Sequence, residues 1–197
     1  MPSSLTWTLK RIHRRLFPMR WRRRLFPMRR LRVRKNKPVL LVVLLRKPHL
    51  LSEEELRAAA EKAWGLSFAE SDGSTRYVVT SGDARVLNAG QHLLSFHSSN
   101  EPYVAVPKDD LSWLPKASQQ RAWAEHSACL YVYYLTPGTD FELAHCILAK
   151  VLAQLLDSNC TGLYSPDEDG LIPADESFYE QLQAMASSRD SHLLAAL

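Results

Sequence analysis

The segment PVLLVVLLRKPHLLSEEELRAAAEKAWG, residues 38–65, carries the clearest strand signal and the clearest helix signal of the chain. Residues 39–45 are apolar without interruption, which predicts a strand covered on both faces of a sheet. Ser52 stands three residues before Glu55, a spacing that predicts a capping box at the start of a helix. That helix is expected to reach about Trp64 and to end at Gly65. The folded part of the chain is therefore predicted to begin at residue 38.

Downstream of this segment, strand and helix patterns follow one another with turn residues between them. Short strands are expected at 76–80, 84–87, 92–97, 129–135 and 161–165, with a turn back to 171–172. Helices are expected from Pro115 to about Ser127, from a second capping box at 139–142 to about Asp157, and from Ser177 to about Ala186. This order predicts an α+β fold, a two-layer domain with a mixed β-sheet covered by helices and preceded by a basic N-terminal arm.

The charges are divided between the arm and the rest of the chain. The full sequence has 197 residues, 25 Lys or Arg and 21 Asp or Glu, for a net charge of +4. Residues 1–37 contain 14 of the basic residues and no acid, which leaves 11 basic residues against all 21 acids, a net charge of −10, in residues 38–197. We therefore expect three parts: the arm (1–37), a globular domain (38–186) and a C-terminal tail (187–197).

The arm repeats a basic heptapeptide, RRLFPMR, at residues 14–20 and 23–29. A basic arm on an acidic body predicts either a polyanionic partner, such as nucleic acid or an anionic membrane surface, or contact between the arm and the body's own acids. The residues proposed to bind a polyanion are Arg14, Arg15, Arg20, Arg22, Arg23, Arg24, Arg29 and Arg30. An Arg-rich, acid-free arm is also compatible with an organellar transit peptide.

Cysteine usage and hydropathy indicate the compartment. The chain has three cysteines, Cys129, Cys146 and Cys160, an odd number without metal-type spacing, which suggests a reducing environment and no disulfide framework. No stretch approaches the roughly 20 apolar residues of a transmembrane helix. We expect a cytoplasmic protein without a transmembrane segment and without a cofactor.

The only candidate catalytic pair is His126 with Cys129, at a predicted junction of helix and strand. One interpretation is a cysteine nucleophile beside a histidine base. The other, which is favoured, is a histidine that interacts well with the C-terminal end of a helix dipole and a cysteine that is buried and inert.

The remaining histidines and acids do not predict a metal site. His92 and His97 are five residues apart on a strand and so face opposite sides of the sheet. His145 and Cys146 are neighbours on a helix and point about 100° apart, with Cys146 expected on the outer side. The carboxylates of 167–169 lack the spacing of a calcium loop.

Three stretches together carry a family resemblance: residues 38–65, quoted above, "PYVAVPKDDLSW" at 102–113, and the segment from "AWAEHSACLYVYYL" at 122–135 to "DFELAHCILAKVLAQLLDSNCTGLYSPDEDGLIPADESF" at 140–178. Over about residues 39–182 the chain resembles an uncharacterised bacterial family, domain of unknown function 4261. The resemblance implies a short helix ending in histidine, an apolar strand and a long helix. It implies no reaction, so no catalytic residue follows from it.

These observations predict an accessory or protein-interaction domain, with another protein as its partner and without enzymatic activity. The first alternative is a polyanion-binding protein that attaches to nucleic acid or an anionic membrane through residues 1–37. The second is a small enzyme that uses His126 and Cys129.

Overall fold

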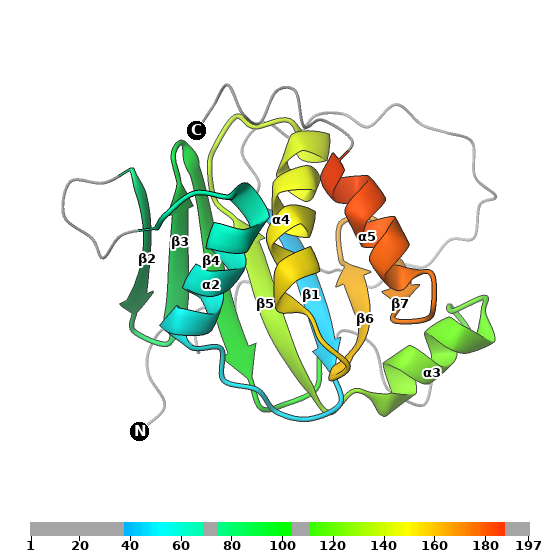
Figure 1. The fold of residues 1–197 in the computed structure, drawn as a ribbon. Helices are drawn as coiled ribbons and strands as arrows, with labels where there is room; N and C mark the ends of the chain where they lie inside the picture. Colours follow the sequence, from blue (N-terminus) through cyan, green and yellow to red (C-terminus); the bar gives the residue numbers. More distant parts are fainter. Residues whose placement is uncertain (1–37, 69–74, 104–110, 188–197) are drawn as a thin grey trace. The chain divides into compact units, whose positions relative to one another are not determined.

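The computed structural model describes residues 38–68, 75–103 and 111–187 (Figure 1). Its strands are β1 (Val39–Leu45), β2 (Arg76–Ser81), β3 (Ala84–Ala89), β4 (His92–Ser99), β5 (Ala128–Tyr134), β6 (Cys160–Ser165) and β7 (Gly170–Pro173). Its helices are α2 (Glu53–Trp64), α3 (Ala117–Glu125), α4 (Phe141–Leu155) and α5 (Phe178–Ser187). These elements confirm the α+β class. The arm (1–37) and residues 188–197 lie outside the described ranges, so the division into domains stays a prediction.

The seven described strands form one sheet in the order β2-β3-β4-β5-β1-β6-β7, and every neighbouring pair is antiparallel. The expectation of a mixed sheet is therefore wrong. The sheet is antiparallel because of the position that β1 takes in the strand order. Strands β5 and β6, joined through α4, run parallel to each other as in a crossover unit, but β1 lies between them and is antiparallel to both. Val42, in the middle of β1, pairs with Tyr131 on one side and Tyr164 on the other.

The local signals at the start of the body form as predicted. The Ser52 hydroxyl accepts a hydrogen bond from the Glu55 N–H at 3.1 Å, and the Ser52 N–H donates to the Glu55 carboxylate at 2.8 Å, which completes the capping box. Helix α2 ends at Gly65, whose φ of 66° is in the left-handed region that glycine adopts without strain. Leu56 and Ala60 on its inner face are fully buried.

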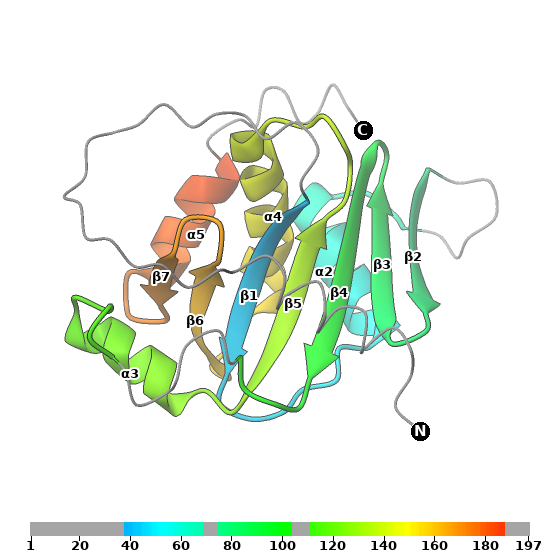
Figure 2. The same cartoon turned by 180° about the vertical axis from the view of Figure 1, so that it is seen from behind.

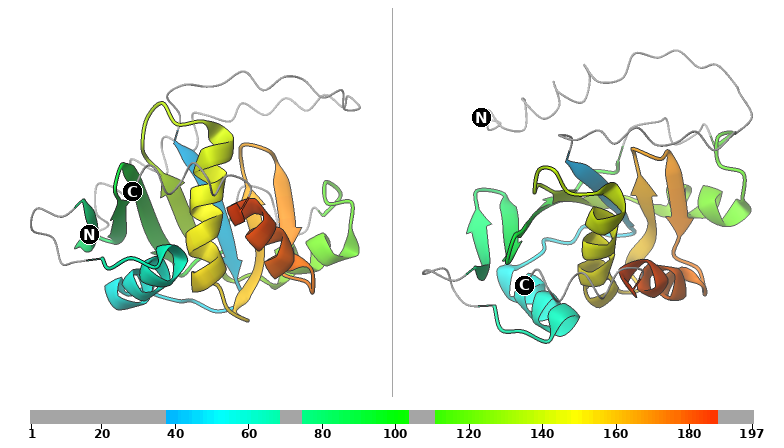
Figure 3. Two further views of the ribbon diagram at one scale, coloured as in Figure 1. Left: turned by 45° about the horizontal axis from the view of Figure 1, so that its top comes forward. Right: turned by 90° about the horizontal axis from the view of Figure 1, so that it is seen from above.

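Helices α2, α4 and α5 cover one face of the sheet (Figures 1 and 3). The main core lies between Ile147 and other residues of this helical layer and alternate residues of the strands. Leu41, Val43, Leu94, Val132 and Ile147 are all 2% exposed or less. Within the part of the chain that the structure describes, no helix is long and apolar enough to cross a membrane.

The opposite face of the sheet is covered beside β1 and β6 by α3 (Figure 2). A second core forms there, in which Trp123 of α3 is fully buried with Val42, Leu44 and Tyr164 of the sheet. Strand β1 is thus buried on both faces, which is the reason for its uninterrupted apolar run.

Two predicted helix starts are displaced. Helix α4 is capped by Asp140, whose carboxylate accepts from the Glu142 N–H at 3.3 Å, so the expected capping box at 139–142 is wrong. Thr139 instead hydrogen-bonds the Tyr134 hydroxyl at 3.1 Å, a tertiary contact that competes with its role as a cap. Helix α3 begins at Ala117, two residues after Pro115.

Candidate functional site

His126 caps the C-terminal end of α3 and is completely buried. Its Nδ1 donates to the carbonyl oxygen of Trp123 at 2.5 Å, and its Nε2 lies 3.3 Å from the carbonyl oxygen of Tyr103. Its ring also lies against the Trp123 ring, with the two centroids 5.2 Å apart. The imidazole therefore ties the end of α3 to the segment at Tyr103.

Cys129, the other candidate catalytic residue, is also fully buried. Its thiol lies 3.6 Å from the carbonyl oxygen of Glu101, to which it donates. Burial raises the pKa of this thiol, which keeps it protonated near neutral pH and makes it a poor nucleophile. The contacts of His126 and Cys129 thus favour the structural interpretation of the pair, and catalysis by them stays a hypothesis.

Aromatic side chains fill the space around His126. Tyr103 lies edge-on to Trp123 at a centroid distance of 6.2 Å and within 5.9 Å of Tyr131. The Tyr164 hydroxyl donates to Asp169 at 2.9 Å. Burial raises the pKa values of Tyr103, Tyr131 and Tyr164 well above the usual range of tyrosine, so these hydroxyls stay neutral. Their edge-to-face geometry is typical of core packing.

His92 and His97 contact protein groups rather than each other. His92 is buried, and its Nδ1 is 2.7 Å from the Tyr134 hydroxyl, while Nε2 of His97 is 2.9 Å from the Ser95 hydroxyl. Among residues 38–68, 75–103 and 111–187, no three His, Cys, Asp or Glu side chains are close enough to hold a metal ion.

Cys146 is 1% exposed, so its expected place on the outer side of the helix is wrong. Helix α4 lies between α2 and α5 (Figure 1), and eight of its residues are buried.

The arginines proposed to bind a polyanion belong to residues 1–37 and lie outside the described residues. Their role stays a prediction that rests on the charge of the arm.

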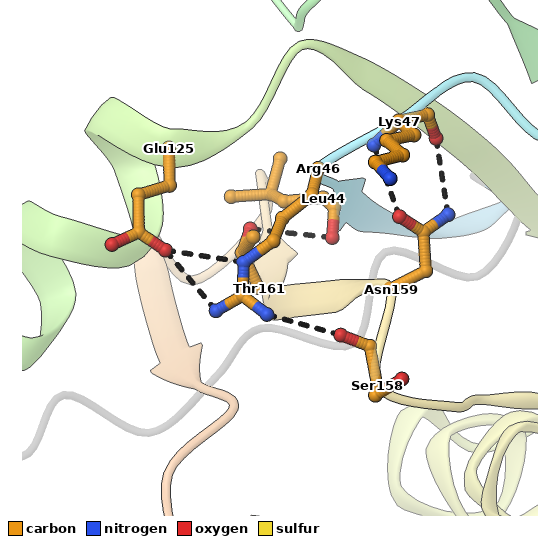
Figure 4. Close-up of polar contacts among 7 residues, drawn as sticks. All are labelled: Leu44, Arg46, Lys47, Glu125, Ser158, Asn159 and Thr161. Carbon is orange, nitrogen blue, oxygen red and sulfur yellow. Dashed lines mark hydrogen bonds and ion pairs between the residues drawn. The ribbon is translucent and has the colours of Figure 1, made fainter.

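Sequence reasoning missed a polar cluster at the end of β1 (Figure 4). The Arg46 guanidinium donates to the Glu125 carboxylate at 3.1 and 3.2 Å and to the carbonyl oxygen of Ser158 at 3.1 Å. The Asn159 side chain accepts from the Lys47 N–H and donates to the Lys47 carbonyl oxygen, both at 3.0 Å. Through these contacts, the chain leaving β1 is fixed to α3 and to the loop between α4 and β6.

The segment that joins β1 to α2, residues 46–52, is also anchored at its C-terminal end. The Leu51 N–H donates to the Ser98 hydroxyl at 3.1 Å, and the Leu51 side chain is only 1% exposed. Leu50, between these anchors, is 69% exposed, the largest exposure among the large apolar side chains in the described ranges. The loop therefore presents one leucine to solvent on a braced backbone.

A groove of about 380 Å³ lies beside this loop, between α2 and the C-terminal end of α4. Its floor is apolar and is formed by Leu45, Leu51, Ala59, Leu130 and Leu155. Its rim carries charges of both signs, from His49, Glu55, Lys62 and Asp157. Nε2 of His49 lies 3.5 Å from the Glu55 carboxylate across part of the rim. We refer to Leu50 together with this groove as the Leu50 face.

One sequence signal points toward the Leu50 face. Two leucines, Leu50 and Leu51, precede the Ser52 cap, where a single apolar residue is enough to pack against the first turn of the helix. Leu51, which adjoins the cap, can fill that role, so Leu50 has none in this local motif. Which of the two is buried depends on contacts with β4 and with the α4–β6 loop, and these are distant in sequence.

Comparisons of the chain with protein-family models, with curated proteins and with solved structures found no match. The resemblance to the family of domain of unknown function 4261 therefore stays a prediction. The geometry of the chain itself carries the functional inference.

Proposed function

We propose that this protein is an accessory domain without enzymatic activity that binds another protein through the Leu50 face. One observation carries the proposal: Leu50, 69% exposed, is held outward on a braced loop beside a groove with an apolar floor. A single exposed leucine is common on protein surfaces and has no meaning alone. Together with the adjoining groove it forms the candidate docking surface of this proposal.

The bracing of the loop supports this function energetically. Association costs conformational entropy when side chains and loops become ordered at an interface. The backbone on both sides of Leu50 is already fixed, by Asn159 at Lys47 and by Ser98 at Leu51. A partner that covers Leu50 therefore orders little of this chain and gains the burial of an exposed aliphatic side chain.

The chemistry of the candidate catalytic pair also supports a role without catalysis. Both ring nitrogens of His126 face main-chain carbonyl oxygens. The Cys129 thiol faces the carbonyl oxygen of Glu101, and its pKa is raised. A nucleophile needs a base within hydrogen-bond reach, and these contacts direct the two side chains elsewhere. A cytoplasmic location is part of the proposal, supported by Cys129, Cys146 and Cys160, which are buried and form no disulfide.

The test is affinity capture of partners by the full-length chain from cells that naturally contain it. Leu50→Asp is compared with wild type and with Leu135→Asp. Leu135 is also a leucine, is 40% exposed and directly follows the C-terminal end of β5. We expect wild type and Leu135→Asp to capture the same protein and Leu50→Asp to lose it, while circular dichroism shows all three to be folded. Equal capture by all three chains would refute docking at the Leu50 face.

A second function is favoured by the division of charge. Residues 1–37 carry 14 cations and no acid, while the rest of the chain has a net charge of −10. Such an arm can hold the protein on nucleic acid or on an anionic membrane while the acidic body stays away from the phosphates. This function does not compete with docking at the Leu50 face, because different parts of the chain serve the two.

A further inference from the structure

We propose that His92 is an acid-sensitive latch, which holds the connection from β5 to α4, residues 135–140, closed on the start of β4 and releases it when the imidazole is protonated. This latch is separate from the proposed function and does not depend on docking at the Leu50 face. It follows from three properties of His92: its hydrogen bonds, its second ring nitrogen and its place between the residues that anchor the connection.

A chain of hydrogen bonds runs from His92 to the connection. Nδ1 of His92 is 2.7 Å from the hydroxyl of Tyr134, the last residue of β5. That hydroxyl is 3.1 Å from the hydroxyl of Thr139, which directly precedes the Asp140 cap of α4. In the neutral ring with its hydrogen on Nδ1, His92 donates to Tyr134, and Tyr134 then donates to Thr139. The imidazole thus links the first residue of β4 to both ends of the connection.

The other ring nitrogen of His92 has no acceptor for a second proton. The residue is 4% exposed, and Nε2 is buried without a hydrogen-bond partner in the part of the chain that the structure describes. A neutral ring tolerates this position, because Nε2 can carry a lone pair there in place of a hydrogen. A protonated ring has N–H groups on both nitrogens, so it would bury a charged donor without an acceptor, which is costly. Burial accordingly lowers the pKa of His92 from its ordinary value of 6.5.

The strands beside His92 bring no negative charge to the ring. On β5 the titratable neighbour is Tyr134, whose pKa is raised by burial, so its hydroxyl stays neutral. On β3, Ala89 pairs with His92, and on β2, Arg76 pairs with Ala89 in the same row of the sheet. The charge in that row is therefore a cation, which opposes protonation of the imidazole.

The start of α4 brings two acids and a histidine near the same end of the sheet. Asp140 and Glu142 are exposed, and the Asp140 carboxylate accepts from the Glu142 N–H at 3.3 Å. Nδ1 of His145 lies 2.9 Å from the carbonyl oxygen of Phe141, within its own helix. None of these groups hydrogen-bonds Nε2 of His92 in the described ranges, so the closed fold stabilises only the neutral imidazole.

His92 lies between the two residues that anchor the connection. The Leu93 N–H donates to the Thr136 hydroxyl at 2.8 Å, and that hydroxyl donates to the Gln91 carbonyl oxygen at 3.1 Å. The Leu135 N–H donates to the Leu93 carbonyl oxygen at 2.8 Å. Because moving the imidazole into water moves its two chain neighbours, these contacts break together with the latch. The connection has little packing of its own, since four of its six residues are exposed: Leu135, Pro137, Gly138 and Asp140.

Acid therefore favours the open state of the connection. The closed state has its full stability above the ordinary pKa of 6.5 and loses it as the pH falls from there toward the lowered folded-state pKa of His92. With an ordinary histidine in the open state and an unprotonated one in the closed state, protonation multiplies the equilibrium constant for opening by about 11 at pH 5.5 and by about 1.1 at pH 7.5. Over this range we expect the opening constant to rise several-fold, with a limit of about tenfold.

The test is amide hydrogen exchange of the full-length chain, followed by NMR at about pH 7.5 and about pH 5.5, with each rate divided by that of an unstructured chain. The Leu93 and Leu135 amides report on the connection. The Arg46 amide, which donates to the Asn159 carbonyl oxygen at 2.9 Å, is the internal reference for opening elsewhere. In wild type we expect the opening constant at the two reporter amides to rise several-fold, up to about tenfold, at the lower pH, and the one at Arg46 to change less.

Three variants accompany wild type. His92→Gln keeps an amide for the Tyr134 hydroxyl but cannot be protonated, so we expect the rise at the reporter amides to be lost. His49→Gln removes an exposed imidazole from the β1–α2 segment and should retain the rise. Tyr134→Phe removes the hydroxyl that joins His92 to Thr139, so the connection should open more often already at about pH 7.5.

Titration of the His92 ring signals in wild type is a second measurement, which needs no variant. We expect the ring to stay neutral in the closed state at pH 6.5, where an ordinary histidine is half protonated. A ring that titrates there while the reporter amides stay protected would overturn the latch. The same holds for a rise that is absent from wild type, persists in His92→Gln or is equal at Arg46, and for a Tyr134→Phe variant that opens no more often than wild type at about pH 7.5.

Discussion

Replacing His126 with asparagine tests whether this buried side chain holds the end of α3 in place. Asparagine can still direct an amide N–H at the Trp123 carbonyl oxygen, which the Nδ1 atom contacts at 2.5 Å. It cannot reach the Tyr103 carbonyl oxygen, which lies 3.3 Å from Nε2. The substitution therefore removes one of the two contacts and the ring atoms that fill the space between them.

The magnitude follows from these two losses. The Tyr103 carbonyl oxygen accepts a hydrogen bond only from an imidazole that is protonated at both nitrogens, and losing that bond costs about 1 kcal/mol. The missing ring atoms leave a cavity of roughly 40 Å³, which at about 24 cal/mol per Å³ costs about 1 kcal/mol more. We expect His126→Asn to lower the free energy of unfolding by about 2 kcal/mol. That loss corresponds to a fall of roughly 4–8 °C in Tm for a domain of this size.

Urea unfolding followed by tryptophan fluorescence is a suitable assay, because Trp123 contacts the ring of His126. His49→Asn is the matched control, since the His49 side chain is 47% exposed and its pair with Glu55 is expected to contribute less than about 1 kcal/mol. The reasoning is refuted if His126→Asn and His49→Asn change the free energy of unfolding equally. A folded His126→Asn variant that has lost an identified activity would instead support the enzymatic alternative.

Three further predictions concern other parts of the chain. Gly162→Ala should lower stability by about 1–3 kcal/mol in chemical denaturation, because a Cβ there would lie 2.9 Å from a main-chain oxygen of β7. Gly170→Ala, whose Cβ would have its nearest neighbour at 3.9 Å, should stay near wild type, and equal effects would contradict the packing argument. The hydrogen bond from the Ser52 N–H lowers the folded-state pKa of Glu55 below 4.5, so its contribution to stability is present above that pH and is lost as the pH falls through the folded pKa. The difference in unfolding free energy between wild type and Glu55→Gln should therefore be larger at about pH 6 than at about pH 3, and a constant difference would exclude this linkage. Removal of residues 1–37 should leave cooperative unfolding intact and abolish the binding of RNA that we expect from the full-length chain at low salt. Loss of cooperativity would place the arm in the core, and equal RNA binding by both chains would remove the polyanion function.

The sequence by itself determined the elements whose signals are local. The capping box of Ser52 and Glu55 needs only residues three apart, and Gly65 ends the helix by its own backbone freedom, so both were predicted at the right positions. The apolar run of 39–45 indicated a strand covered on both faces, and the two cores on either side of β1 confirm it. The C-terminal end of α3 was expected at about Ser127 and lies at Glu125, with His126 as the cap.

Only the tertiary structure decided the order and direction of the strands. The hydropathy pattern of a strand reflects which of its faces are buried and does not specify which strands pair with it. The insertion of β1 between β5 and β6 made the sheet antiparallel, and α4, lying between two helices, buried Cys146. The Leu50 face arises in the same way. The hydrogen bonds of Asn159 to Lys47 join residues 112 positions apart, and that of Leu51 to Ser98 joins residues 47 positions apart. These contacts hold the segment in which Leu51 is buried and Leu50 is exposed. No local pattern can encode that choice, since the free energy that settles it comes from groups that meet only in the folded chain.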